Sequence, residues 1–242
     1  MTLVLSLVLA AAQATGQVAS NPQATDGLKE LKQASNKGDL ATVERILSAK
    51  PEWAEAKDEA GVSFLLNALY RQRGEVVRAY VRRRKAFDLF EASALGRTKD
   101  LAALLKQHAD VKSYSPDGFI ALGLASFFAQ PDAVRLLLAN GADVNQYAKA
   151  PHVQALHSAA AGKCIECVRL LLEKGADPNS PQDGGFRPLH ETAANNDRAM
   201  AELLISKGAL PDIKDDKGKT SADFARERGH PEMAAWLDSL KR

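Results

Sequence analysis

The chain has 242 residues, of which 45% are apolar and 26% are charged, proportions that are ordinary for a globular protein. The formal net charge of +2 excludes the strong global attraction to nucleic acid or anionic membranes that very basic chains show. Aromatic residues make up only 6%, whereas alanine and leucine are abundant, so closely packed helices are favoured over a sheet-rich core.

The N-terminus differs in composition from the rest of the chain, because no charged side chain precedes Asp26. Residues 3–12 form an apolar run that is too short to cross a bilayer as a helix. The small-x-small sequence that ends at Ala14 matches a signal-peptidase site, so we expect a signal peptide over 1–14 and a polar leader over 15–26. The run lacks the usual preceding Lys or Arg, and a buried N-terminal segment is the alternative.

One phrase recurs along the chain with a period of 33 or 34 residues. It reads LAALLKQHADVK at 101–112, AVRLLLANGADVN at 133–145, CVRLLLEKGADPN at 167–179 and MAELLISKGALPD at 200–212. A second phrase keeps the same period, with QALHSAA at 154–160 and RPLHETAA at 187–194. Self-similarity at this period indicates a repeat architecture in which each unit is one supersecondary motif.

These phrases resemble the ankyrin repeat, whose signature joins a T-P-L-H-x-A-A helix start to a V-x-x-L-L helix and a G-A-D-x-N loop. The resemblance implies an all-α ankyrin-repeat solenoid of helix–turn–helix units with short hairpin-like fingers between them. Carried outward in phase, it covers nearly all of the chain after the leader. The expected units lie near 27–57, 58–88, 89–113, 114–147, 148–181, 182–215 and 216–242.

The apolar pattern inside the units supports this architecture. In the second helices Val and Leu recur at i, i+3 and i+4, as at Val168, Leu171 and Leu172, which gives each helix one apolar stripe. Helices this short are unstable alone, so each unit must bury its stripe against its neighbours. Val77 and Leu101 are only 24 residues apart, which predicts continuous stacking but a notch in the row of fingers between units two and three.

The only two cysteines, Cys164 and Cys167, form a C-x-x-C pair. In repeat phase Cys167 takes the place of Ala133 and Met200, and Cys164 lies at the turn before the second helix, which favours two buried structural thiols. A disulfide is the main alternative, because an exported chain meets an oxidising compartment. Catalytic redox chemistry is the least favoured interpretation, because no β-α-β pattern surrounds the pair.

No catalytic or metal-binding motif stands out in the sequence. A zinc site would need two histidines beside the cysteine pair, yet the resemblance places His157 and His190 in a structural slot that bonds the backbone between units. The sequence has no Gly-rich phosphate loop, no H-E-x-x-H and no G-x-S-x-G. We therefore expect no metal, no cofactor and no enzymatic activity.

The segment RQRGEVVRAYVRRRK at 71–85 is strongly basic and contains a single Glu. A solvated outer helix face together with a tight connection is the plainer interpretation, and a patch for an acidic protein or for lipid headgroups is the alternative. The arginines of this possible anion patch are Arg71, Arg73, Arg78, Arg82, Arg83 and Arg84.

The expected fingers carry the best candidates for binding, because stacked repeats present long surfaces to their partners. Tyr114 and Tyr147 lie 33 residues apart, so we expect exposed tyrosines in register on adjacent fingers. Phe119, Phe127 and Phe128 are expected to pack between units. Fingers that are polar only for solubility are the alternative. The candidate partner-binding residues are Tyr114, Asp117, Tyr147, Lys149, His152, Asp183 and Phe186.

The sequence favours a non-catalytic scaffold or inhibitor that binds an unidentified protein partner on its concave face. A redox or oxidative-stress protein that uses Cys164 and Cys167 is one alternative, and a secreted effector that binds a host protein is another. We expect a monomer that is exported to a bacterial periplasm or secreted, with no nucleic-acid partner and no stable insertion into a membrane.

Overall fold

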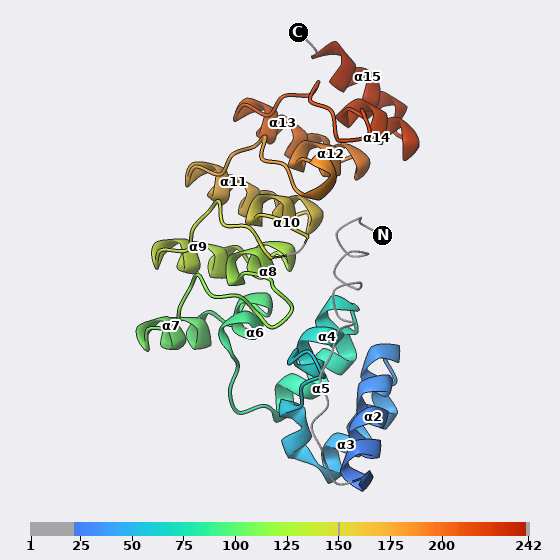
Figure 1. The fold of residues 1–242 in the computed structure, drawn as a ribbon, viewed down its shortest axis with the longest axis vertical. Coiled ribbons are helices and arrows are strands. Elements are labelled where there is room, and N and C mark those ends of the chain that lie inside the picture. Colours follow the sequence, from blue (N-terminus) through green and yellow to red (C-terminus); the bar gives the residue numbers. More distant parts are fainter. Residues whose placement is uncertain (1–21, 150, 241–242) are drawn as a thin grey trace.

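The structure is a computed structural model that describes residues 22–149 and 151–240, and in these residues the α-helices form seven consecutive pairs. The pairs stack in chain order from α2–α3 to α14–α15, as Figure 1 shows. The described residues contain no strand, so the predicted all-α repeat solenoid is confirmed. The predicted signal peptide over 1–14 lies outside the described residues, and within them no helix combines the length and apolar character that a bilayer crossing requires.

Each pair joins a first and a second helix through a tight turn. The first helices are α2 (Pro22–Lys37), α4 (Phe64–Tyr70), α6 (Leu89–Ala94), α8 (Ala121–Phe127), α10 (Ala155–Ala161), α12 (Pro188–Ala194) and α14 (Ser221–Glu227). The second helices are α3 (Leu40–Ala49), α5 (Gly74–Arg83), α7 (Thr98–Lys106), α9 (Pro131–Ala139), α11 (Ile165–Glu173), α13 (Arg198–Ser206) and α15 (Pro231–Ser239). Two 3-10 turns, η1 (Pro51–Glu55) and η2 (Asp183–Gly185), lie in connecting loops. Helix α2 begins inside the predicted leader.

The apolar stripes of the second helices form the main core. Leu137, Leu171 and Leu204 occupy the same slot in successive units, and each is completely buried. Burial of one such side chain is worth about 1.5–3 kcal/mol, but each of these leucines reaches that burial only with neighbouring units in place. The core is therefore continuous along the stack and is shared between neighbouring units.

Two asparagines of the recurring loop link neighbouring units through the backbone. Asn145 donates from Nδ2 to the carbonyl oxygen of Gly175 at 3.3 Å, and its Oδ1 accepts the N–H of Asp177 at 3.3 Å. Asn179 makes the same two contacts with the loop after α13, at 2.8 and 2.9 Å. Both side chains reach the unit that follows them, so these bonds fix the register of units four to six.

Buried histidines make a second set of backbone bonds. The Nδ1 of His190 accepts the N–H of Arg187 at 3.0 Å, and its Nε2 donates to the carbonyl oxygen of Ile213 at 3.1 Å in the next loop. His157 holds the same slot in α10, where its Nδ1 accepts the N–H of Gln154 at 3.4 Å. Burial disfavours the charged imidazolium and so lowers the pKa of both histidines, to about 4 for His157.

The connector between units two and three has only five residues, 84–88, because the finger found at the other junctions is missing. Arg84 lies in this connector with its side chain 4% exposed, and its guanidinium pairs with Glu55 and with Glu91 at 2.6 Å each. The ring of Phe87 lies 5.6 Å from the same guanidinium. One buried arginine thus ties η1, the connector and α6 together.

The stack bends at this connector (Figure 1). Helix α4 packs against α6, whereas α5 and α7 do not lie side by side. The finger turn of unit two therefore reaches the finger turn of unit four, where a Cβ on Gly61 would lie 3.4 Å from the Cβ of Pro116. The predicted continuous stacking holds for the first helices but not for the second helices. The predicted notch in the row of fingers is also wrong, because the contact between Gly61 and Pro116 joins the fingers of units two and four.

We expect Arg84→Ala to lower the free energy of unfolding by about 3–5 kcal/mol, because it leaves the buried carboxylate of Glu91 without its counter-charge. The matched variant Arg82→Ala removes an exposed partner of Glu44 and should lose less than about 1 kcal/mol. Urea unfolding followed by circular dichroism compares the two. Equal losses in both variants would show that the connector does not depend on the buried arginine.

A pH dependence follows from His157. The folded protein keeps this histidine neutral down to a pKa of about 4, while the unfolded chain takes up the proton near 6.5. Because the unfolded state binds more protons between these values, stability falls as the pH is lowered from 6.5 to 4, by up to about 3 kcal/mol from this residue. In His157→Gln the free energy of unfolding should fall less steeply over that range, whereas the exposed His108→Asn control should follow the parent. A parent-like slope in His157→Gln would contradict this assignment.

Candidate partner-binding surface

Finger turns stand in a row along one edge of the stack. Each is closed by a backbone hydrogen bond of 2.8 or 2.9 Å across the turn. Isolated antiparallel bridges at Lys57–Ser63 and Tyr114–Ile120 flank two of the turns, in agreement with the predicted hairpin-like shape. In the described residues the closing bonds run from Asp58 to Val62, from Ser115 to Phe119, from Ala148 to Val153, from Gln182 to Phe186 and from Asp215 to Lys219.

Neighbouring fingers are also bonded to each other. The N–H of Lys149 donates to the carbonyl oxygen of Gly118 at 2.9 Å, which joins the fingers of units four and five. The N–H of Asp216 donates to the carbonyl oxygen of Gly184 at 3.0 Å, which joins those of units six and seven. Main-chain bonds of this kind fix the spacing within these two pairs of fingers, so each pair is a preorganised surface.

The finger of unit five is one residue longer than the others. Its closing bond spans five residue steps, from Ala148 to Val153, where the other closing bonds span four. This extra residue accounts for the 34-residue interval between Val134 and Val168, against 33 between Leu101 and Val134 and between Val168 and Ala201. The longer turn carries His152 in the left-handed region with φ of 44°. Histidine is one of the residue types that adopt this region more readily than most, and His108 also adopts it in this chain, with φ of 62°.

Tyr114 and Lys149, two of the predicted partner-binding residues, are in contact on the fingers of units four and five. Tyr114 is 38% exposed, and the ammonium group of Lys149 lies 4.9 Å from the centroid of its ring. Such cation–π contacts are worth about 0.5–1 kcal/mol at exposed sites, so this contact favours the observed orientation of the tyrosine ring. Asp117 lies in the same finger, where it accepts the Ser115 hydroxyl at 2.5 Å.

A second pair joins the fingers of units five and six. The Nδ1 of His152 lies 3.0 Å from Oδ1 of Asp183, and the two side chains are 60% and 58% exposed. The pair therefore lies at the surface. His152 shares the finger of unit five with Lys149, and Asp183 lies on the finger of unit six. Four of the seven predicted residues thus form two adjacent polar contacts across three fingers.

Tyr147 and Phe186 do not join this surface in the way that the sequence suggested. The hydroxyl of Tyr147 lies 2.7 Å from the Ser180 hydroxyl of the next unit, and the ring is half-buried. Phe186 is only 6% exposed and packs edge-on against Phe224, with 5.0 Å between ring centroids. Phe186 closes its finger turn as Phe119 does, and the residue at that position points into the stack. The expected pair of exposed tyrosines is therefore reduced to Tyr114.

Inner aromatic residues form a second apolar cluster between α4, α6 and α8. Phe119 lies in it, and Phe127 and Phe128 pack against it, as predicted, with 5.2 Å between the centroids of the last two rings. Tyr70 and Phe90 were missed by the sequence analysis, because the short third unit obscures the period there. The Tyr70 ring lies 6.1 Å from that of Phe128, and burial raises the pKa of its hydroxyl.

The basic stretch at 71–85 does not form one cationic surface. Arg84 is buried in the connector, and Arg82 and Arg83 share the carboxylate of Glu44 in α3. These partners hold the pKa of Glu44 below its ordinary value. Half of the possible anion patch is therefore neutralised within the protein, because α3 packs against α5 and the short connector places Arg84 between Glu55 and Glu91.

The other three arginines lie around the turn between α4 and α5. Arg78 pairs with Glu75, and the Nε of Arg73 donates to the carbonyl oxygen of Asn36 at 3.1 Å. Arg71 is half-buried at the end of α4. Most of the stretch thus serves contacts inside the N-terminal units; Arg84 fits the tight connection of the plainer interpretation, whereas Arg82, Arg83 and Arg73 bind other elements and do not form a purely solvated face.

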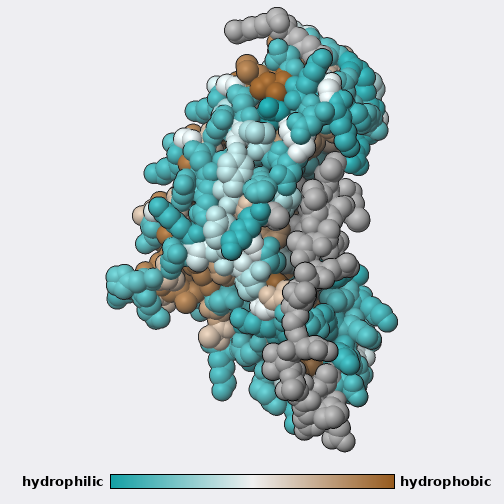
Figure 2. Space-filling model, in the orientation of Figure 1, coloured by the Kyte–Doolittle hydropathy of each residue, from teal (hydrophilic) through white to brown (hydrophobic). Residues whose placement is uncertain are grey.

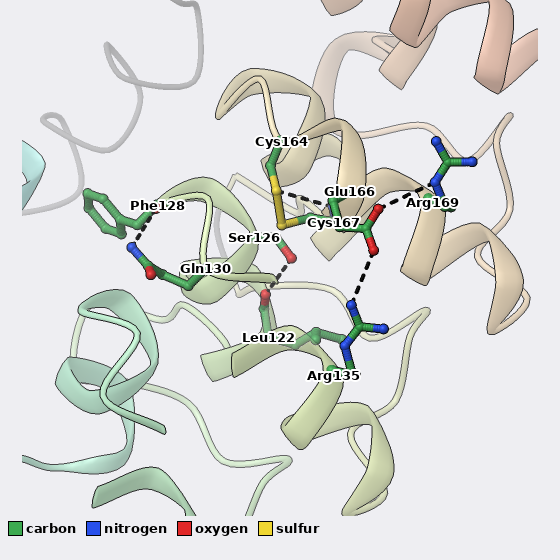
Figure 3. The surroundings of a disulfide bond; sticks show 9 residues. All are labelled: Leu122, Ser126, Phe128, Gln130, Arg135, Cys164, Glu166, Cys167 and Arg169. Carbon is green, nitrogen blue, oxygen red and sulfur yellow. Dashed lines mark hydrogen bonds and ion pairs between the residues drawn. A yellow bond between two sulfur atoms is a disulfide. The ribbon is translucent and has the colours of Figure 1, made fainter. Parts of the chain in front are cut away.

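The cysteine pair is oxidised. Cys164 and Cys167 form a disulfide with their Cα atoms 5.2 Å apart, within the usual range. The structure thus shows the alternative and not the two free thiols that the sequence favoured. Figure 3 places the pair at the start of α11, beside Glu166, whose carboxylate is held by Arg135 and Arg169. Among the described residues no three His, Cys, Asp or Glu side chains lie close enough together to hold a metal ion.

The face of the molecule that Figure 2 shows is predominantly hydrophilic. In the face turned toward the viewer in Figure 2, apolar side chains gather mainly at the level of α6 and α7, beside the bend. The finger surface formed by Tyr114, Lys149, His152 and Asp183 is thus polar and aromatic. This composition suits the specific recognition of a folded protein, in which a few aromatic side chains carry much of the binding energy.

Comparison with known proteins agrees with the geometry. The family described as "Ankyrin repeats (3 copies)" matches residues 89–182 and 156–239, which together cover more than half of the chain. Cyclin-dependent kinase 4 inhibitor B of Bos taurus is 32% identical over 120 residues, which are 48% of this chain and 88% of that protein.

Two larger relatives contain similar repeats. Ankyrin repeat domain-containing protein SAT10 of Stachybotrys chartarum is 27% identical over 172 residues, which are 69% of this chain but 9% of that protein. Ankyrin repeat and SOCS box protein 6 of Mus musculus is 32% identical over 99 residues, which are 40% of this chain and 24% of that protein. The chain thus spans a small part of these two relatives. Its repeats, their stacking and the family match together show that the chain belongs to the ankyrin repeat family.

Proposed function

We propose that this chain is an exported, non-catalytic binding protein that holds one protein partner on its finger row and the adjoining faces of its first helices. The observation that carries the proposal is the finger row itself, in which main-chain bonds from Lys149 to Gly118 and from Asp216 to Gly184 fix neighbouring tips. A surface that is already ordered loses little entropy on binding, so its contacts translate into affinity.

The centre of the proposed interface lies on the fingers of units four to six. Tyr114 presents an exposed ring that Lys149 contacts, and His152 and Asp183 offer hydrogen-bonding groups on the fingers of units five and six. Exposed aromatic residues beside polar groups are typical of residues that dominate protein interfaces. This composition favours a folded protein partner over a small apolar ligand.

The relatives support an inhibitory role for such binding. By its name, cyclin-dependent kinase 4 inhibitor B blocks another protein, and the chain matches most of its length. We propose by analogy that this chain acts on its partner by occupying a surface, without chemistry of its own.

Export is proposed from two independent features. The apolar run at 3–12 followed by Ala14 matches a cleaved signal, and the Cys164–Cys167 disulfide fits an oxidising compartment such as the bacterial periplasm. The mature chain would then begin near residue 15.

The interface is tested with a partner crosslinked in the native compartment and then purified. Tyr114→Ala should weaken binding by at least about tenfold, which is about 1.4 kcal/mol, and His152→Ala should weaken it in the same direction. Lys99→Ala, an exposed lysine on the outer helix α7, is the matched control and should bind like the parent. Parent-like affinity of both finger variants, measured by calorimetry, would move the interface away from this surface.

Export is tested by expressing the full chain in a bacterium and sequencing the N-terminus of the product in each cell fraction. We expect a periplasmic product that begins just after Ala14. Leu5→Arg places a charge in the apolar run and should leave the chain uncleaved in the cytoplasm, whereas Gln17→Arg, beyond the cleavage site, should be processed normally. An intact Met1 on all of the parent product would contradict export by cleavage.

A further inference from the structure

Two of the sister units place a carboxylate at the position of Cys164, whereas the other four place Arg73, Arg97, Gln130 and His230 there without a side-chain cap bond. Cys164 is the N-cap residue of α11, and its Sγ accepts the N–H of Cys167 at 3.2 Å. At the equivalent positions of units one and six the N-cap residues are Asp39 and Asp197. Each carboxylate accepts the N–H of the third residue after it, at 3.1 and 3.0 Å. A sulfur atom thus stands where two sister units place an anion.

This position stabilises negative charge on sulfur. The first N–H groups of a helix have no partner inside the helix, and they direct the positive end of the helix dipole at the N-cap. A thiol at such a site ionises more readily than a free thiol. The exposed carboxyl of Asp39 shows the same effect, because its bonds to Thr42 lower its pKa below the ordinary value. Cys164 is therefore suited to exist as a thiolate once the disulfide opens.

The charged surroundings do not cancel this effect. Lys163 directly precedes Cys164 and is exposed. Glu166 is the nearest acidic residue in α11, and Arg135 of α9 and Arg169 of α11 bind its carboxylate at 3.2 and 3.4 Å, as Figure 3 shows. The negative charge closest to the pair along the chain is thus balanced by two guanidinium groups.

The two sulfur atoms differ in access. Cys164 is 7% exposed at the turn, whereas Cys167 is completely buried in the slot that holds Ala133 and Met200 in the sister units. Both residues are buried, but Cys164 lies nearer to solvent, so it is the sulfur that an external thiolate would attack, with Cys167 as the group that leaves. This asymmetry separates an attacked sulfur from a resolving one, which a disulfide with two equally buried ends would lack.

We propose that the Cys164–Cys167 disulfide is a thiol–disulfide exchange site that oxidises low-molecular-weight thiols of the glutathione class. The thiolate of the first thiol attacks Cys164, which breaks the protein disulfide and releases Cys167, and Cys167 takes up a proton. A second thiolate attacks the outer sulfur of the mixed disulfide and releases Cys164 as a thiolate. In sum, the protein disulfide gains two electrons, two thiols become one disulfide, and one proton goes to solvent.

The proposal does not depend on the partner-binding function, and two single-cysteine variants test it. Cys167→Ala leaves Cys164 alone and introduces the residue of unit four, while Cys164→Asp leaves Cys167 alone and restores the cap of units one and six. Both variants should therefore fold, which thermal unfolding checks. At pH 6, where an ordinary thiol with a pKa of about 8.5 is almost fully protonated, iodoacetamide should modify folded Cys164 at least about tenfold faster than the same chain in urea.

The intact chain supplies the second measurement. Reduced glutathione should open the disulfide of the folded chain, and mass spectrometry of the Cys167→Ala variant treated with glutathione disulfide should find the adduct on Cys164. Cys167 in the folded Cys164→Asp variant should react more slowly than in urea. A folded Cys164 that reacts no faster than in urea, or a disulfide that stays closed in reduced glutathione, would overturn the proposal and assign the bond a purely structural role.

Discussion

The whole structure depends on one constraint: no helix pair can bury its own apolar stripe. The second helices have nine or ten residues, too few to be stable alone, and their leucines reach full burial only between neighbours. Every other feature follows from the need to keep adjacent units in contact. Asparagines and histidines that bond the next loop fix the register, and the loops themselves project as fingers because the stacked helices occupy the space behind them.

The junction between units two and three shows what happens when this requirement meets a short connector. Without a finger the second helices cannot come side by side, so the stack bends and α4 alone continues onto α6. A buried arginine with two carboxylate partners compensates for the lost apolar contact. The same bend brings Gly61 to Pro116, so the row of fingers stays continuous although unit three has no finger.

Sequence periodicity was enough to predict the architecture, because identical slots 33 residues apart must be buried in the same way. The interval of 34 residues between Val134 and Val168 reflects the extra residue in the finger of unit five. The period alone did not show where in the unit that residue lies. Periodicity does not tell which side chains meet across units. Arg82 and Arg84 look alike in the sequence, and only the approach of Glu55 and Glu91 makes one of them buried.

The candidate surface shows the same limit. The spacing of Tyr114 and Tyr147 predicted equivalent positions, but a serine in the following unit draws one tyrosine inward. Phe186 directly follows the turn residues of its finger in the sequence, which suggested an exposed position. It is buried because it is the residue that closes the turn. For the cysteines, a spacing of three residues at a helix start suits either a disulfide or two packed thiols, and the preference for packed thiols, taken from the repeat phase, was wrong.

The bonds of Asn145, Asn179 and His190 all run from one unit to the next toward the C-terminus. The stack therefore has a direction, and its two ends are not equivalent. As the chain leaves the ribosome, the polar groups of each unit find their partners only after the following unit has emerged. Folding during synthesis thus lags one repeat behind the growing end, and a nascent chain always displays one unsatisfied face, which the next repeat covers.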